Sequence, residues 1–121
     1  MNNIEKEFVP YQESLELKSI GFDEPCFAYY YDKSGTLIDY LPKSSNKELI
    51  GIIDRCSAPL YQQAFRFFRE KYGLHSYIKF DNIFEKYSYT INDEFKISIP
   101  THEEAELACL RKLIQIVKEK L

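Results

Sequence analysis

The sequence predicts an α+β fold in which an antiparallel sheet, made of an N-terminal hairpin and a three-stranded meander, packs with three main helices. Segments with helical apolar spacing lie between prolines and glycines, which are typical helix boundaries. Short alternating segments follow one another with only turn residues between them, and such consecutive strands pair antiparallel. A chain of 121 residues is long enough for one core but not for two, so we expect a single domain over residues 1–121.

The first helix is expected between Pro10 and Gly21. Proline suits the first helical position, and glycine suits the left-handed residue that follows the last turn. Phe22 then falls where a Schellman motif places an apolar contact back to Leu17. The polar residues 1–7 that precede this helix are expected to be frayed.

The next segment, CFAYYYDKSGTLIDYL, predicts two strands around a turn at residues 32–35. Residues 26–31 are apolar on both faces, which is typical of a central strand covered on both sides. Residues 42–58 have the least regular pattern, because Gly51 and the β-branched isoleucines at 52–53 disfavour a helix. Within them Ser45 and Glu48 have the spacing of a capping box and predict a short helix.

A second helix is expected between Pro59 and Gly73, with its rings spaced on one helical face. A third begins with Thr101 and Glu104, which have capping-box spacing. Its broad apolar stripe contains Leu107, Leu110, Leu113, Ile114, Val117 and Leu121.

Three strands are expected between these helices, at residues 75–80, 84–91 and 94–99. In the last two, apolar residues alternate with polar ones, so each strand is expected to have one solvated face. Asn92 and Asp93 suit a two-residue hairpin turn, because both residue types tolerate a positive φ.

The stretch FRFFREKYGLHSYI, residues 65–78, combines rings, cations and a histidine, as a surface for single-stranded nucleic acid would. Helical geometry, however, places most of its rings on one face and Arg66 and Arg69 elsewhere. Rings and cations are therefore not interleaved, and we expect the rings to lie in the core. His75 is expected to be a hydrogen-bonded residue at the start of the next strand.

Composition and charge limit the classes of partner and compartment. The net charge is −3, with −4 in residues 1–25 and +2 in residues 26–75, so no concentrated basic face is expected. The three cysteines form no CxxC pair and suit a reducing compartment. Without a signal-peptide pattern or a long apolar run, the sequence predicts a cytoplasmic protein that does not bind membranes.

The residues that carry chemistry do not form a recognisable catalytic pattern. Cys26, Cys56 and Cys109 are far in sequence from both histidines, and we interpret them as small buried apolar residues. The histidines and carboxylates lack metal-ligand spacing, and the four glycines form no phosphate-binding loop. We therefore expect no enzymatic activity, no cofactor and no metal, and we predict no catalytic residue.

Two resemblances follow from longer stretches. The αβββα order of residues 60–121 is similar to that of the double-stranded RNA-binding domain, but THEEAELACL places acids where that domain has a basic cluster. The strings FVPY, LKSIGFDEPCFAYY, QAFRFFREKYGLHSYI and EEAELACLRKLI resemble a family of small hypothetical proteins of Bacteroidetes bacteria and their phages. This resemblance implies a prophage or mobile-element origin, and it implies that residues 42–58 are a variable segment, an insertion relative to shorter members. It implies no particular activity or cofactor and transfers no site residues.

The leading hypothesis is a non-enzymatic accessory protein that binds another protein or itself. Ten tyrosines and nine phenylalanines are many for one small core, and tyrosine is favoured at interfaces. Alternatively, rings such as Tyr29–Tyr31, Tyr40, Tyr87 and Tyr89 cover the sheet beneath the helices. The expected partner is a protein or a second copy that packs sheet or C-terminal helix faces together.

Two other hypotheses remain open. One is a nucleic-acid-binding module, which the acidic balance disfavours, using Arg66, Arg69, Lys71 and Lys79. The other is a protein that binds a small ligand or nucleotide in an aromatic pocket near Cys26 and Tyr30. The candidate surface contacts are Asp23, Glu24, Tyr30, Arg66 and His75.

Overall fold

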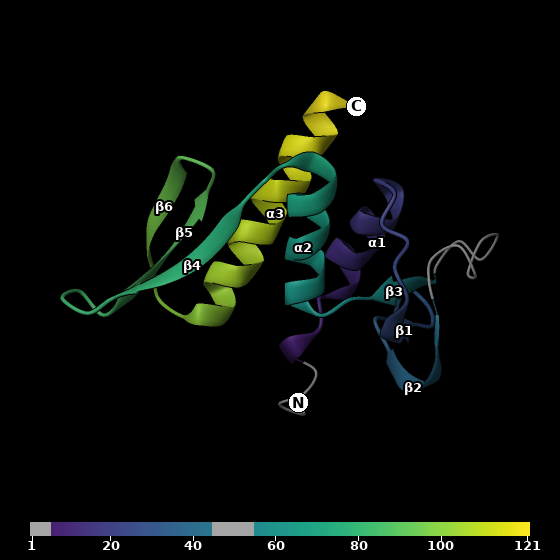
Figure 1. Ribbon diagram of the computed structural model, residues 1–121. Coiled ribbons are helices and arrows are strands. Elements are labelled where there is room, and N and C mark those ends of the chain that lie inside the picture. Colours follow the sequence, from purple (N-terminus) through teal and green to yellow (C-terminus); the bar gives the residue numbers. More distant parts are fainter. Residues whose placement is uncertain (1–5, 45–54) are drawn as a thin grey trace. The chain divides into compact units, whose positions relative to one another are not determined.

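The computed structural model describes residues 6–44 and 55–121, with the backbone alone described for residues 39–44. It has the α+β fold that the sequence predicts (Figure 1). The helices are α1 (Tyr11–Ser19), α2 (Tyr61–Tyr72) and α3 (His102–Lys120). The strands are β1 (Cys26–Tyr30), β2 (Leu37–Ser44), β3 (Cys56–Ala58), β4 (Ser76–Asp81), β5 (Lys86–Ile91) and β6 (Glu94–Ile99).

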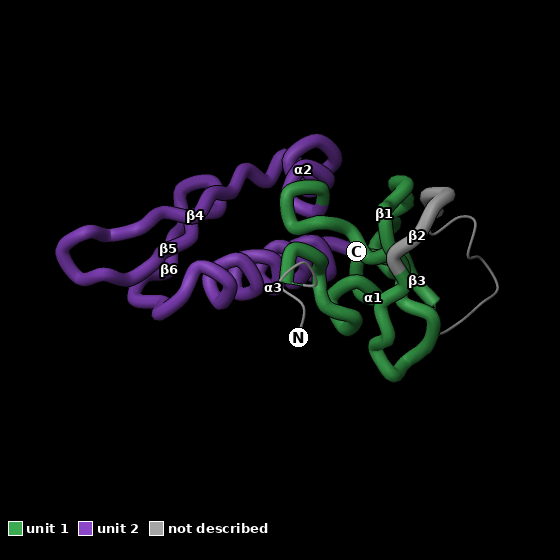
Figure 2. The backbone as a smooth tube through the Cα atoms, turned by 90° about the horizontal axis from the view of Figure 1, so that it is seen from below, with its two compact units in different colours: residues 1–63 green, residues 64–121 purple. Residues whose placement is uncertain are grey.

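The chain divides into two compact units, residues 1–63 and 64–121 (Figure 2). Each unit contains its own three-stranded antiparallel sheet, ordered β2–β1–β3 in unit 1 and β4–β5–β6 in unit 2. The predicted hairpin and meander are therefore parts of separate sheets. The reason is that β3 pairs with the second edge of β1, so the hairpin sheet is completed within residues 1–63.

The core of unit 1 forms around its central strand β1. Phe8, Ala28, Tyr30, Cys56 and Ala58 make a buried cluster. The chain before α1 joins this core through an antiparallel bridge from Phe8 to Leu60 and through the Val9 N–H, which donates to the Pro59 carbonyl at 2.8 Å. Residues 6 and 7 form a 3₁₀ turn just before the bridge. Residues 1–5 lie outside the described residues, so the fraying expected for residues 1–7 stays a prediction.

Helix α1 ends in the predicted Schellman motif. Gly21 has a φ of 97°, a left-handed value that glycine adopts without a Cβ clash. The Phe22 N–H donates to the Leu17 carbonyl at 2.9 Å, and the Gly21 N–H donates to the Lys18 carbonyl at 3.2 Å. These two bonds satisfy carbonyls that the last turn leaves without helical partners. Leu17 and Phe22 are both buried, as the motif requires.

The first sheet has one strand that the sequence did not predict and one prediction that is corrected. Within the segment 42–58, residues 56–58 form strand β3, and all three are buried. Residues 45–54 lie outside the described residues, and so does the expected capping box at Ser45 and Glu48. Strand β1 is central, as predicted, but only one of its faces is buried. Phe27, on the other face, is 46% exposed.

Helices α2 and α3 have the boundaries that their prolines, glycine and cap predict. The Thr101 hydroxyl accepts from the Glu104 N–H at 3.1 Å, which confirms the N-cap. In α2 the exposed Arg66 and Arg69 lie away from the buried Phe68, as predicted. In α3 the predicted stripe is buried at Leu110, Leu113, Ile114 and Val117, whereas Leu121 follows the helix end and is 80% exposed.

Unit 2 contains the predicted meander, with α3 packed along one face of β4–β5–β6 (Figure 1). Asn92 and Asp93 form the predicted two-residue turn, since Ile91 pairs with Glu94 and Asn92 has a φ of 53°. Ile91, which shares a face with Tyr87 and Tyr89, is buried. This face of the sheet provides the packing surface for α3.

A β-bulge in β6 changes which side chains face α3. Strict alternation places Phe95, Ile97 and Ile99 on one face, but the register shifts by one residue, so that Tyr87 pairs with Ile99 and Tyr89 with Lys96. Ser98, inside this shift, has a φ of 66°. Consequently Ile99 joins the helix-packed face, while Phe95 and Ile97 stay on the opposite face. The prediction of one solvated face is thus wrong for β6, where residues 94–98 are all exposed.

Gly73 provides a test of the boundary between α2 and β4. Its φ is 66°, and an added Cβ would meet no atom within 4 Å, so the backbone conformation alone disfavours a side chain. Gly73→Ala is expected to lower the free energy of unfolding by about 1–2 kcal/mol, the penalty for a left-handed L-residue. Gly73→Asn is expected to lower it less, because asparagine tolerates this region. Urea titrations of both variants measure the difference; equal effects would contradict a left-handed residue 73.

Candidate interaction surface

The outward face of β4–β5–β6 carries large apolar side chains. Cross-strand pairing places Tyr77, Thr90 and Phe95 in one row across the three strands. The same register puts Lys79 opposite Ser88. These residues face away from the side that α3 covers, because successive residues of a strand point to opposite faces.

The opposite face is fixed by contacts with α3. The Tyr87 ring lies edge-on to the His102 ring, with centroids 5.6 Å apart. The Ser76 hydroxyl hydrogen-bonds the Cys109 side chain, and burial raises the pKa of Tyr89. Helix α3 therefore holds one face of the sheet, and it leaves the row of Tyr77 and Phe95 facing outward.

Five side chains define what we call the outer apolar surface. On the strands, Tyr77 is 59% exposed, Phe95 70% and Ile97 59%. In the β4–β5 turn, Ile83 is 84% and Phe84 72% exposed. The turn extends past α3 in both views (Figures 1 and 2). All five residues lie within residues 77–97 of one sheet, so they are not scattered over the surface of the chain.

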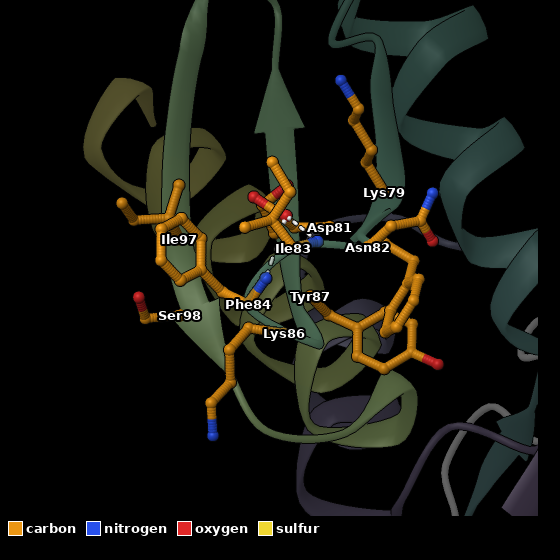
Figure 3. Close-up of a pocket in the computed structure, with 11 residues that line it drawn as sticks. Lys79, Asp81, Asn82, Ile83, Phe84, Lys86, Tyr87, Ile97 and Ser98 are labelled. Carbon is orange, nitrogen blue, oxygen red and sulfur yellow. Dashed lines mark hydrogen bonds between the residues drawn. The ribbon is translucent and has the colours of Figure 1, made fainter.

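The Asp81 carboxylate fixes the turn that presents Ile83 and Phe84. Its Oδ1 accepts from the Ile83 N–H at 2.8 Å and from the Phe84 N–H at 3.3 Å, shown as dashed lines in Figure 3. Asp81 pairs with Lys86, and Glu85 has a φ of 52°, so the loop between the strands returns in a defined conformation. The two apolar side chains are therefore held outward by hydrogen bonds within the turn.

An open hollow of about 510 Å³ adjoins this turn. Phe84 and Ile97 lie beside each other at it, and the ammonium groups of Lys79 and Lys86 extend away from it (Figure 3). Its lining consists of Lys79, Phe80, Asp81, Asn82, Ile83, Phe84, Lys86, Tyr87, Ser88, Ile97 and Ser98. The hollow therefore has largely apolar walls, and its charged lining residues are of both signs.

Of the predicted surface contacts, Tyr30 is corrected. Its side chain is 6% exposed, its hydroxyl donates to the Val9 carbonyl at 2.7 Å, and its ring lies 5.5 Å from that of Tyr11. Tyr30 is buried because it lies with Cys26 and Ala28 on the covered face of β1. Cys26, on the same face, is also buried, so both residues near which a ligand pocket is expected pack in the core.

The other four predicted contacts lie near the surface but on different elements. Asp23 is exposed and Glu24 half-buried in the loop between α1 and β1. Arg66 is on α2, and its Nε lies 3.7 Å from a carboxylate oxygen of Glu70. His75 is exposed ahead of β4, where its N–H donates to Asn92 Oδ1 at 3.0 Å. Neither Arg66 nor His75 belongs to the outer apolar surface.

The sequence pattern does not predict the outer apolar surface. Phe95 and Ile97 fit an ordinary alternating strand, and only the bulge turns them away from the buried Ile99. A signal was present at Ile83 and Phe84, because two large apolar residues between Asn82 and Glu85 are unusual in a turn.

The cysteines have no activating environment. Burial raises the pKa of Cys26, Cys56 and Cys109 to about 12 each. In the described residues His102 contacts Tyr87 and Glu106 rather than a thiol. No cluster of potential metal ligands occurs in residues 6–44 and 55–121.

Comparisons with family models, curated proteins and solved structures give no match to this chain. In the part of the chain that the structure describes, no helix combines the length and the apolar character needed to cross a bilayer.

The buried thiols predict slow alkylation and a loss of stability in alkali. Because the folded pKa is raised from 9.0 to about 12, each thiol stays protonated in the fold while the unfolded thiol ionises. This contribution to stability is complete below pH 9.0 and falls, by about 1.4 kcal/mol per pH unit for each thiol, as pH rises toward 12.

Intact-mass analysis after iodoacetamide treatment at mildly alkaline pH tests this expectation. The native chain should stay largely unmodified, whereas all three cysteines should react in denaturant. Gln115→Cys, at an exposed position of α3, provides the matched control and should gain one modification rapidly. Rapid modification of the unsubstituted native protein would contradict the burial of its thiols.

Proposed function

We propose that this chain is a non-enzymatic accessory protein that binds protein through the outer apolar surface. The observation that carries the proposal is the gathering of Tyr77, Ile83, Phe84, Phe95 and Ile97, each at least 59% exposed, on one sheet and its turn. A prophage or mobile-element origin, which the sequence resemblance implies, belongs to the same proposal and does not affect its test.

Exposed apolar residues are common singly, so their grouping is what supports an interface. Three of the five are aromatic, the residue class most enriched at the centres of protein interfaces. The Asp81 hydrogen bonds hold the turn in place, so little conformational entropy is lost when Ile83 and Phe84 are covered. The surface therefore has the composition and rigidity of a binding site.

A protein partner is favoured over nucleic acid by charge. Residues 76–99 contain three lysines against four carboxylates, a net of −1, whereas phosphate binding needs a concentration of cations. Two of the four cations expected to bind nucleic acid also have partners within the chain: Arg66 lies near Glu70, and Lys71 lies 5.6 Å from the ring centroids of Phe67 and Tyr72.

Site-specific photo-crosslinking tests the proposal. Benzoylphenylalanine is introduced at Phe84 or Phe95, with Phe27 as the matched control because it is a 46% exposed phenylalanine outside this surface. Positions 84 and 95 are expected to give a discrete adduct in cells that is sensitive to protease and resistant to nuclease, and position 27 is not. A variant with both Phe84→Ser and Phe95→Ser should lower recovery of the same partner by about tenfold, the effect of losing interface anchors.

Three results would count against protein binding at this surface. Absence of adducts at 84 and 95 is one, and equal labelling at 27 is another. Nuclease-sensitive adducts, together with an affinity that falls steeply as salt increases, would instead establish the nucleic-acid alternative.

A further inference from the structure

Strand β6 has an open edge. The order β4–β5–β6 leaves β6 with one neighbour in the described chain, and Glu94 to Ser98 are all exposed. Because Ile91 and Glu94 close a two-residue turn, they form a hydrogen-bonded pair, and such pairs alternate along an antiparallel ladder. The N–H and C=O of Phe95 therefore point away from β5, toward the open edge.

We propose that two copies of this chain pair antiparallel through β6, with Phe95 of each copy directly opposite Phe95 of the other. This proposal rests on the proposed function and names the partner as a second copy. The register places Glu94 opposite Lys96 of the second copy, and Lys96 opposite its Glu94. Two reciprocal charge pairs then flank the central hydrogen-bonded pair.

Charge selects this register over its neighbours. Sliding one strand by two residues in one direction places Lys96 opposite Lys96, and sliding it by two in the other direction places Glu94 opposite Glu94; like charges directly opposite each other destabilise a sheet. The bulge at Ser98, with its φ of 66°, bends the strand and ends regular pairing beyond Ile97. The regular part of the edge is therefore short and carries its own complementary charges.

Pairing through β6 also joins the two outer apolar surfaces. Tyr77, Thr90 and Phe95 form one row across a single sheet, and the proposed register continues that row into the second copy. Phe95, which is 70% exposed in the single chain, gains an aromatic neighbour directly opposite. An edge that would otherwise attract unrelated strands is thereby covered by a specific partner.

The other edge strand, β4, is less suited to pairing. In an antiparallel pairing of two β4 strands centred on Phe80, Asp81 would lie opposite Lys79 of the second copy. The Asp81 carboxylate already accepts hydrogen bonds from the N–H groups of Ile83 and Phe84. Phe80, at the centre of such a register, is 43% exposed, and its ring centroid is 5.0 Å from that of Tyr87. Asp81 and Phe80 of β4 are thus already engaged within the chain, which makes β4 a poorer pairing edge than β6.

Charge reversal at the β6 edge tests the proposal by sedimentation equilibrium at protein concentrations up to the millimolar range. Glu94→Lys and Lys96→Glu each replace two attractive pairs by two repulsive ones and should raise the dimer dissociation constant by about tenfold or more. Combining both substitutions restores opposite charges and should restore dimerisation. Lys79→Glu makes the same charge change on β4 and should have no effect.

Oxidative crosslinking checks the register independently. Phe95→Cys should form a disulfide-linked dimer readily, because the two residues of a hydrogen-bonded pair lie about 5.5 Å apart at Cα, within disulfide range. Tyr77→Cys, exposed in the same row but on the other edge, is the control and should crosslink slowly. The native thiols do not compete, since all three are buried.

The outcomes separate this inference from the proposed function. A strict monomer, or a dimer that ignores Glu94 and Lys96, overturns pairing through β6, as does equal sensitivity to Lys79→Glu. If photo-crosslinking at Phe84 and Phe95 still yields a distinct protein, the proposed function stands with another partner. A monomer that also forms no adducts overturns both.

Discussion

The one-residue bulge in β6 is the constraint on which the candidate surface depends. It lets Ile99 pair with Tyr87 on the face that α3 covers, while Phe95 keeps its place opposite Thr90 on the other face. Without the extra residue, alternation would force Phe95 and Ile99 onto the same side. Ile99, which is now buried, would then lie on the exposed face with Phe95, and α3 would lose its contact with this side chain. The bulge thus lets one short strand supply both packing and an exposed surface.

The helix-covered face of the sheet buries its apolar side chains, whereas the outward face exposes them. On the covered side, Ile91 and Ile99 are buried beneath α3, whose Thr101 cap fixes the start of the helix close to the sheet. Burying such a side chain contributes about 1.5–3 kcal/mol, so one face suffices to hold the sheet on its helix. The outward apolar residues contribute no comparable burial within the chain. Their presence is therefore better explained by an intermolecular role than by the stability of the fold.

The sequence predicts local structure better than it predicts which faces are covered. Helix ends were predictable because Gly21 and Thr101 act through backbone geometry and local hydrogen bonds, and the Asn92 turn was predictable for the same reason. Strand β3 was missed because its three residues are too few to show alternation. The burial of Tyr30 and the exposure of Phe95 were missed because both depend on long-range register, which residue order alone does not contain.

The outer apolar surface, which we propose for binding, belongs to unit 2. In unit 1, the Val9 carbonyl accepts from both Ser14 Oγ at 3.0 Å and the Tyr30 hydroxyl at 2.7 Å, so two buried polar side chains are satisfied by one backbone group. No buried side-chain nitrogen or oxygen among the described residues lacks a hydrogen-bond partner. Polar groups with internal partners stabilise a fold and leave little for a ligand to recognise. Phe84 and Phe95, by contrast, expose most of their surface on a rigid sheet, where a partner can cover them.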